Sequence, residues 1–285
     1  MSLLAAACLV CIASAEGQVV PQNHPAPAAG APRSIVLPRE LVSGAPATLS
    51  VLDIAGRLVT GVTLETTGGE TLHTDATGRA EFLAPAAPGK FIVHVEGQMI
   101  ATSALVVPAP DPAPDASVSV QLSSTPHVLD IHNRFELAGI GFRGNADDNH
   151  IAIGEKQALV LAASPTSVVA MLDPGTPLGA AVLSVGVANQ APPATAAVIV
   201  VTLDAIASEG ALRVGQQTTF TVRVRGTTEP LAIEVSDLSP AILQLPGGNP
   251  LKVTSTGGSN NVAQFEVVPL AVGKYSVRAH LASNE

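Results

Sequence analysis

Short runs of alternating apolar and polar residues recur along most of the chain. In Phe91–Glu96, the residues Phe91, Val93 and Val95 share one face of an extended strand, and the residues between them share the other. Residues 220–225 alternate in the same way. Turn signals containing glycine and proline separate these runs, and this spacing is typical of β-sandwiches. The pattern therefore predicts an all-β protein.

Two Pro/Ala-rich segments divide the pattern. Residues 16–33 are predicted to form a disordered or polyproline spacer, and residues 108–115 a second one. In polyproline geometry the second segment would span roughly 25 Å as a semi-rigid strut. The chain of 285 residues is also too long for one sandwich of roughly 100 residues. We expect three tandem Ig-like β-sandwich domains joined by Pro/Ala-rich linkers, at residues 34–107, 116–201 and 202–285.

The first residues have the pattern of a signal peptide. Leu3–Ile12 is an unbroken apolar run, too short to span a bilayer, and the A-x-A sequence Ala13-Ser14-Ala15 follows it. No Lys or Arg precedes the run. We predict a signal peptide at residues 1–15 with cleavage between Ala15 and Glu16. The mature protein would be secreted, periplasmic or attached to the cell surface. The alternative is a buried strand of the first domain.

Both cysteines lie within this segment, at Cys8 and Cys11. Cleavage would therefore leave a chain without disulfides, which exported domains tolerate. Two alternatives remain at this point. Cys8 could carry a lipid, or the Cys-x-x-Cys spacing could bind zinc if the segment stayed in a folded domain.

Composition narrows the functional classes. Apolar residues make up 47 % of the chain but aromatic residues only 2 %, and there is no Trp, so the cores must be built from Val, Leu, Ile and Ala. The formal net charge is −9. The sequence has no basic stripe, which disfavours binding to nucleic acid or to an anionic membrane surface. After the first segment, no stretch is long and apolar enough to span a membrane.

The motifs of the first and last domains resemble known exported sandwiches. Residues 56–59, 74–82 and 88–95 resemble the turns and strands of prealbumin-like and bacterial Ig-like domains of surface proteins. The third domain, with its strands at residues 220–225 and 273–281, resembles bacterial Ig-like repeats in general. These resemblances imply a fold and no activity.

The second domain resembles a more specific family. A strand leading into a glycine turn at residues 135–142 is followed by apolar strands at 151–154, 166–172 and 179–189. This order resembles the IPT/TIG domain, an Ig-like sandwich found in surface receptors, bacterial surface proteins and some starch-processing enzymes. The resemblance implies a module for binding or spacing.

The glycines Gly139, Gly141 and Gly144 match the letters of the dinucleotide-binding G-x-G-x-x-G motif. That motif requires a helix N-terminus after the loop to hold the pyrophosphate. The residues that follow, Asn145–His150, instead predict a turn and a strand, with an acidic pair that would repel phosphate. We therefore predict a β-turn with glycines in special backbone conformations.

Three clusters are candidates for metal ligands. The loop Asn145–Asn149, which contains Asp147 and Asp148, offers the oxygen ligands that calcium favours, although turns of sandwiches are rich in Asp and Asn for backbone reasons alone. Asp111 and Asp115 in the spacer are a weaker candidate. A third cluster comprises His127, Asp130 and His132. On a strand, Asp130 and His132 would share a face and His127 would lie on the other, so this trio would not converge. We therefore assign no metal site and no cofactor.

Residues for catalysis, sugar binding or cross-linking are also sparse. There is no G-x-S-x-G nucleophile motif. Sugar sites favour aromatic platforms, and such a site would need Tyr275 or Phe265 to be exposed. A buried isopeptide would need one of four lysines, of which Lys90 and Lys274 are instead predicted to protect sheet edges. The lysines are Lys90, Lys156, Lys252 and Lys274.

Together these patterns predict an exported, non-enzymatic, multi-domain Ig-like protein. It would act as a spacer, adhesion or assembly module at the bacterial cell surface or in the periplasm, with a protein or cell-envelope partner. Exposed sheet edges would offer β-augmentation to such a partner. The alternative is a non-catalytic, carbohydrate-binding part of a polysaccharide-processing system. An enzyme is a third possibility, which a pocket with converging carboxylates would support.

Overall fold

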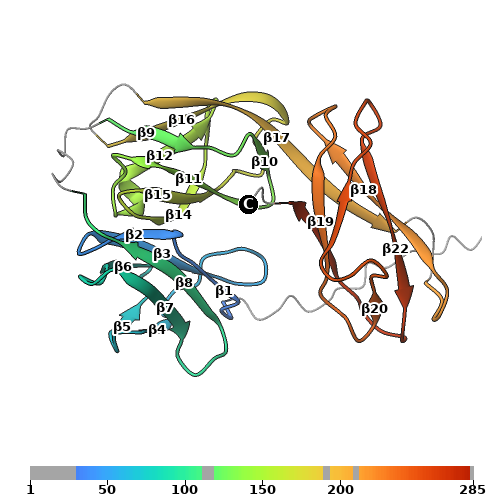
Figure 1. The fold of residues 1–285 in the computed structure, drawn as a ribbon, viewed down its shortest axis with the longest axis horizontal. Helices are drawn as coiled ribbons and strands as arrows, with labels where there is room; N and C mark the ends of the chain where they lie inside the picture. The colour runs from blue at the N-terminus through green and yellow to red at the C-terminus, as the bar shows by residue number, and fades with distance from the viewer. Residues whose placement is uncertain (1–29, 111–118, 189–192, 208–211, 283–285) are drawn as a thin grey trace, which may run out of the picture.

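The computed structural model describes residues 30–110, 119–188, 193–207 and 212–282. These residues fold into β-strands that pack as three successive sandwiches, with a short 3₁₀ helix η1 (Ala146–Asp148) as the helical element in the described part (Figure 1). The described residues include no helix that is long and apolar enough to cross a membrane. The predicted all-β sandwich fold is confirmed.

The first sandwich packs a sheet of three short strands against a five-stranded sheet. Leu49, Leu64 and Val93 are fully buried between the sheets, and Phe82 stacks on Phe91 with ring centroids 5.5 Å apart. The alternation of apolar residues thus places one face of each strand in the core. The strands of the smaller sheet are β1 (Ser34–Val36), β3 (Pro46–Leu52) and β6 (Arg79–Leu83), and those of the larger one, in spatial order, are β2 (Glu40–Val42), β8 (Ala101–Val107), β7 (Gly89–Val95), β4 (Thr63–Thr66) and β5 (Thr71–His73).

The second sandwich also packs two sheets around a core, which includes Leu137, Ile151 and Leu183. One of its sheets contains, in order, β9 (Gln121–Ser124), β11 (Arg134–Ile140), β15 (Ser167–Met171) and β14 (Leu159–Ala163). The other contains β13 (Lys156–Gln157), β12 (Asn149–Ile153), β16 (Gly179–Val187), β17 (Ala194–Ala207) and β10 (Val128–Asp130).

The third sandwich encloses a core around Phe220, Ile233 and Phe265. The strand predicted at residues 273–281 is shorter than expected and begins at Val277. One sheet continues from β17 through β18 (Thr218–Arg225), β22 (Val262–Pro269) and β20 (Leu243–Gln244), and the other has three strands, β21 (Leu251–Thr254), β19 (Ala232–Asp237) and β23 (Val277–Leu281).

Sheets continue from one sandwich into the next. β3 of the first sandwich pairs with β14 of the second through Thr48 and Ala163. β17 pairs with β16 in the second sandwich and then with β18 in the third (Figure 1). The boundary predicted between residues 201 and 202 therefore falls inside a strand, because the β-branched run continues there without Gly or Pro.

The first and second sandwiches also lie in direct contact. The strut predicted at residues 108–115 therefore does not hold them apart. Residues 111–115 of that segment lie outside the described residues.

Candidate functional site

The first and second sandwiches share a small hydrophobic core of their own. Val36 and Leu52 of the first sandwich are buried against Leu161, Ala162 and Val169 of the second, and all five are at most 5 % exposed. Burial of apolar surface stabilises such a junction in the way it stabilises a domain core. The contact is therefore a packed interface.

Arg79 is a buried polar link across this junction. Its Nη1 lies 2.9 Å from Asp147 Oδ1, and its Nε and Nη2 donate to the carbonyl oxygen of Val160 at 3.1 and 2.6 Å. Arg79 is only 9 % exposed, so its charge requires these partners. Three donors on one rigid guanidinium fix the two sandwiches in orientation as well as in distance.

The glycines of the G-x-G-x-x-G sequence have structural roles. At Gly139, where β11 bulges, an added Cβ would lie 2.1 Å from the carbonyl oxygen of Gln121. Gly141 has a φ of +88°, which confirms the predicted special conformation. At Gly144 a Cβ would lie 2.1 Å from the carbonyl oxygen of Pro46 in the first sandwich. No local sequence pattern indicates this last contact.

The candidate calcium loop lies at the same junction. Asn145 Oδ1 accepts the amide of Asp147 at 2.8 Å, and Asn145 Nδ2 donates to Glu81 of the first sandwich at 2.6 Å. Asp147 is paired with Arg79. No group of three or more potential metal-ligating side chains occurs in the described part of the chain. The loop is thus an interdomain contact, while Asp111 and Asp115 lie outside the described residues, as do Ala13, Ala15 and Glu16 of the predicted cleavage site.

The trio His127, Asp130 and His132 does not assemble a metal site. β10 ends at Asp130, and the chain turns there instead of continuing as a strand to His132 as predicted. Asp130 is buried, and it accepts the amide of His132 at 3.1 Å and Asn133 Nδ2 at 2.6 Å. Burial raises the pKa of Asp130, and these hydrogen bonds offset only part of that effect. Both histidines are exposed.

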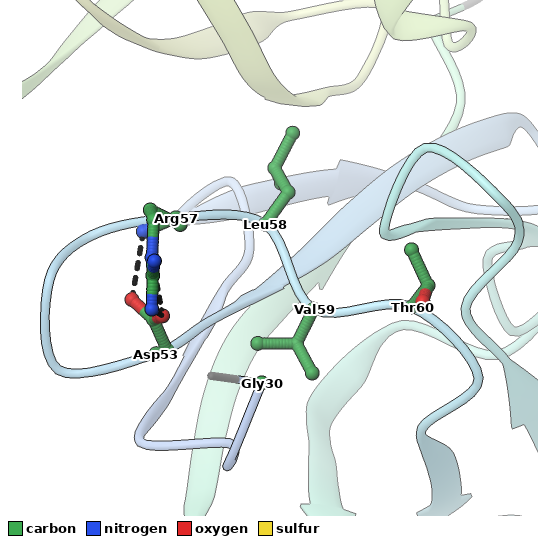
Figure 2. Close-up of a pocket in the computed structure, with 6 residues that line it drawn as sticks. All are labelled: Gly30, Asp53, Arg57, Leu58, Val59 and Thr60. Atoms are coloured by element: carbon green, nitrogen blue, oxygen red, sulfur yellow. Dashed lines mark hydrogen bonds and ion pairs between the residues drawn. The ribbon is translucent and has the colours of Figure 1, made fainter. Parts of the chain in front are cut away.

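A recess in the first sandwich is lined by Gly30, Asp53, Arg57, Leu58, Val59 and Thr60 (Figure 2). Asp53 Oδ1 accepts the amides of Ala55 and Arg57 at 2.8 and 2.9 Å, and Asp53 Oδ2 pairs with the Arg57 guanidinium. Burial acts to raise the pKa of Asp53, but hydrogen bonds from Arg57 and Ala55 outweigh it and lower the pKa. Leu58 points away from these groups and packs on the junction core. The ionic pair thus fixes a loop that supports the junction.

The remaining candidates are two aromatic residues for sugar binding and four lysines for a buried cross-link. Phe265 is 4 % exposed, whereas Tyr275 is 41 % exposed and packs on Phe220 with ring centroids 6.0 Å apart. Lys90 pairs with Leu105 of β8, and β4 pairs with β7 only at Val93, His94 and Val95, so β7 is an internal strand whose β4 side is not paired at Lys90. All four lysines are exposed, which excludes the buried cross-link.

Comparison with known proteins finds matches of low identity among solved structures. No family model and no curated protein matches the chain, so the resemblance to the IPT/TIG domain stays a prediction. A Bacteroides ovatus mixed-linkage glucan utilization locus protein, SGBP-B, solved with a heptasaccharide, is 16 % identical, with a TM-score of 0.24, over 90 % of this chain and 63 % of its own. Domains 1–6 of the surface layer protein SbsC are 14 % identical, with a TM-score of 0.21, over 89 % and 39 %.

The N-terminal four Ig domains of Dscam1 isoform 7.44 are 8 % identical, with a TM-score of 0.26, over 84 % of this chain and 72 % of that one. This chain spans 63 % of the length of the first of these structures and 39 % of the second.

Proposed function

We propose that the protein is a non-catalytic structural module, a stiff row of Ig-like sandwiches that holds partners of an exported assembly at a fixed spacing. The observation that carries this proposal is the continuity of the sheets between sandwiches. β17 belongs to two sandwiches at once, and the first junction has its own buried core. Interfaces of this kind oppose hinge motion, which is otherwise the default between domains.

Placement at the cell surface or in the periplasm is part of the proposal. It is supported by the predicted signal peptide at residues 1–15. The mature chain from Glu16 would contain no cysteine, because both lie before the predicted cleavage site. A stiff module without disulfides must draw its rigidity from packing, and the junctions provide such packing.

The absence of cysteine from the mature chain also makes the stiffness measurable. Spin labels would be attached through single cysteines introduced at the exposed residues Glu70 and Ser259, in the first and third sandwiches. The label-to-label distance, measured by pulsed electron paramagnetic resonance, is expected to be a single narrow distribution. A broad distribution would overturn the stiff-module proposal. The label pair Glu70 and Glu155 provides a control across the first junction alone.

The partner would be sought by capture. Immobilised mature protein, residues 16–285, would be incubated with a cell-envelope fraction and with a polysaccharide panel, each with and without calcium. Selective capture of an envelope protein is the expected result. Dependence on calcium would contradict the assignment of the Asn145–Asn149 loop as an interdomain contact.

Carbohydrate binding is the second candidate, because Tyr275 presents an exposed ring against Phe220. Retention on a glucan that is lost in Tyr275→Ala would favour this function. Leu270→Ala is a matched control, since Leu270 is also exposed in the third sandwich but lacks a ring. Equal loss in both variants would argue against a ring-specific site.

A further inference from the structure

The second sandwich has a solvent-facing sheet surface without charged side chains. On β16 and β17 the residues that alternate with the core side chains Leu183, Val185 and Val198 face outward. In the described part of these strands within the second sandwich, none of the outward residues is Asp, Glu, Lys or Arg. This free face comprises Ala180, Val182, Ser184, Thr195, Ala197 and Ile199.

The solvent-facing surfaces of the other two sandwiches differ from the free face. In the first sandwich, His94 of β7 lies 2.8 Å from Glu65 of β4. In the third, Arg225 of β18 pairs with Asp204 of β17 at 2.7 Å. Charged groups on a surface hold water and oppose association. The free face lacks such groups, so little opposes its contact with a second apolar surface.

Large and small side chains alternate on the free face as in a checkerboard. Val182 lies beside Ala197 in the register of the two strands, and Ala180 lies beside Ile199. Val182 is 58 % exposed and Ile199 is half-buried, so each projects next to an alanine. Alanine is unfavourable in strands because it packs little surface on the pleat. The two alanines leave room for projections from an apposed surface.

The free face continues into an interface that is already formed. Val201 and Leu203 follow Ile199 on the same face of β17, and both are buried in the core of the third sandwich. The strands β19 and β23 of that sandwich supply the opposite side of this core. A sheet of the third sandwich therefore covers this face of β17 from Val201 onward. A sheet is thus the kind of surface that packs on this side of β17.

We propose that the free face binds the free face of a second copy of the chain. The two-fold axis lies in the interface, perpendicular to the strands, between the levels of Ala180 and Val182. It places Val182 of each copy on Ala180 of the other, and Ile199 on Ala197 in the same way. Each projecting side chain thus meets a small one, and the contact is isologous. This self-association goes beyond the proposed function, because a stiff module needs no second copy.

The third sandwich selects this axis over one parallel to the strands. A parallel axis between β16 and β17 would also place Val182 on a small residue, Ala197. It would, however, bring the two third sandwiches to the same end of the interface, where the sheets that cover Val201 would collide. The perpendicular axis puts them at opposite ends of the dimer.

Charge and area both bear on the choice of a second copy. A two-fold axis brings identical groups together, so charges on such a face would repel each other, and the free face has none. With the neighbouring strands β12 and β13, the sheet offers roughly 300 Å² in projection, from a strand spacing of about 4.8 Å and a rise of about 3.3 Å per residue. Two such areas bury less surface than the roughly 1,200 Å² of a stable interface. The dimer is therefore weak and forms where chains are concentrated, as in an assembly.

Sedimentation of the mature chain, residues 16–285, tests this pairing at concentrations up to about 1 mM, which populate a weak dimer. Dimers are expected, and added salt should strengthen them because it screens the net charge of −9. Val182→Asp is expected to weaken association at least tenfold, since it buries a charge against Ala180 of the other copy. Leu105→Asp is the matched control, because Leu105 is exposed in the first sandwich and gains the same charge. A chain that stays monomeric, or equal association of the two variants, would overturn the proposal.

Paired charge variants test the axis. In an equimolar mixture, Val182→Asp in one copy faces Ala180→Lys in the other, so the mixture is expected to associate at least tenfold more tightly than either variant alone. Val182→Asp mixed with Ala197→Lys is the control, because the perpendicular axis does not bring these positions into contact. All three side chains are exposed, so the variants should fold. Equal or tighter association in the control mixture would overturn the axis and with it the proposed dimer.

Two further outcomes separate the dimer from the proposed function. A narrow distance distribution between Glu70 and Ser259 in a chain that stays monomeric would leave the stiff module standing and reject the dimer. A broad distribution in a chain that dimerises as expected would reject the stiff module and leave the dimer standing.

Discussion

The two junctions of the molecule are made in different ways. The first relies mainly on side chains: beside the single backbone pairing of Thr48 with Ala163, it has a buried apolar cluster around Leu161 and the hydrogen bonds of Arg79. The second is built from backbone, because β17 runs through it without interruption (Figure 1). A junction of side chains depends on a few residue identities, whereas a continuous strand depends on main-chain pairing. The first should therefore be sensitive to truncation, and the second only to changes that disturb the backbone.

The second junction has one such backbone-sensitive position. Gly226 has a φ of +100°, and a Cβ there would lie 2.2 Å from the carbonyl oxygen of Val200 in β17. Gly226→Ala is expected to lower the free energy of unfolding by about 3 to 4 kcal/mol, from overpacking together with strain. Gly258→Ala is the control, since Gly258 has a φ of +76° but open space around it. In urea unfolding, Gly226→Ala should lose more stability than Gly258→Ala, because only the first variant adds a steric clash to the backbone strain. Equal losses of stability in the two variants would show that the clash does not contribute.

Truncation in the apolar cluster should weaken the first junction. Leu161 is fully buried, so Leu161→Ala is expected to cost about 3 kcal/mol through lost burial and a cavity. The thermal transitions of the first two sandwiches should then separate in calorimetry. Leu105→Ala, at a side chain that is 52 % exposed, should leave a single transition. A cooperative transition retained in Leu161→Ala would show that other contacts hold the junction.

Loss of Arg79 should have a smaller effect at the same junction. Arg79→Ala leaves the buried carbonyl of Val160 without its partner, at a cost of about 2 kcal/mol. Asp147 adds little to this cost because its side chain is 71 % exposed. The pair Arg225–Asp204 is the matched surface case, and Arg225→Ala should cost less than about 1 kcal/mol. If urea unfolding showed a similar loss of stability in Arg79→Ala and Arg225→Ala, the buried hydrogen bonds of Arg79 would stabilise the protein no more than a surface ion pair does.

The contrast between the junctions also shows what the sequence could reveal. The strands follow from the local alternation of apolar and polar residues, and the turns follow from glycines such as Gly141. Both kinds of element could therefore be predicted. The partner of Arg79 lies 81 positions away at Val160, and no local pattern encodes such a contact. Gly144 was recognisable as a constrained glycine, but not as a contact with Pro46. One signal was overlooked: the β-branched run Val198–Thr202 continues across the predicted boundary without Gly or Pro, which indicated a strand that crosses it.

The smallest expected effects concern two aspartates whose pKa values are shifted in opposite directions. The pKa of Asp53, in the loop that supports the first junction, is lowered from its ordinary value of 3.8. Its ionised form therefore contributes stability above pH 3.8, and this contribution is lost as the pH falls through the lowered pKa. Asp53→Asn should be less stable than the native chain at pH 6, and the difference should shrink at acid pH in urea titrations. A difference independent of pH would show that the carboxylate charge is not what stabilises the loop.

Asp130, next to the second junction, should behave in the opposite way. Burial raises its pKa above 3.8, so the folded state holds this proton more tightly than the unfolded state does. The stability that Asp130 contributes is fully present below pH 3.8 and is lost as the pH rises through the raised pKa. Asp130→Asn should therefore gain stability relative to the native chain between pH 3 and pH 7, whereas Asp53→Asn loses it. Measuring both variants in the same urea titrations cancels pH effects that are common to the whole chain. If the stability difference from the native chain changed with pH in the same direction for both variants, the environments of the two carboxylates would not differ as their burial and hydrogen bonding imply.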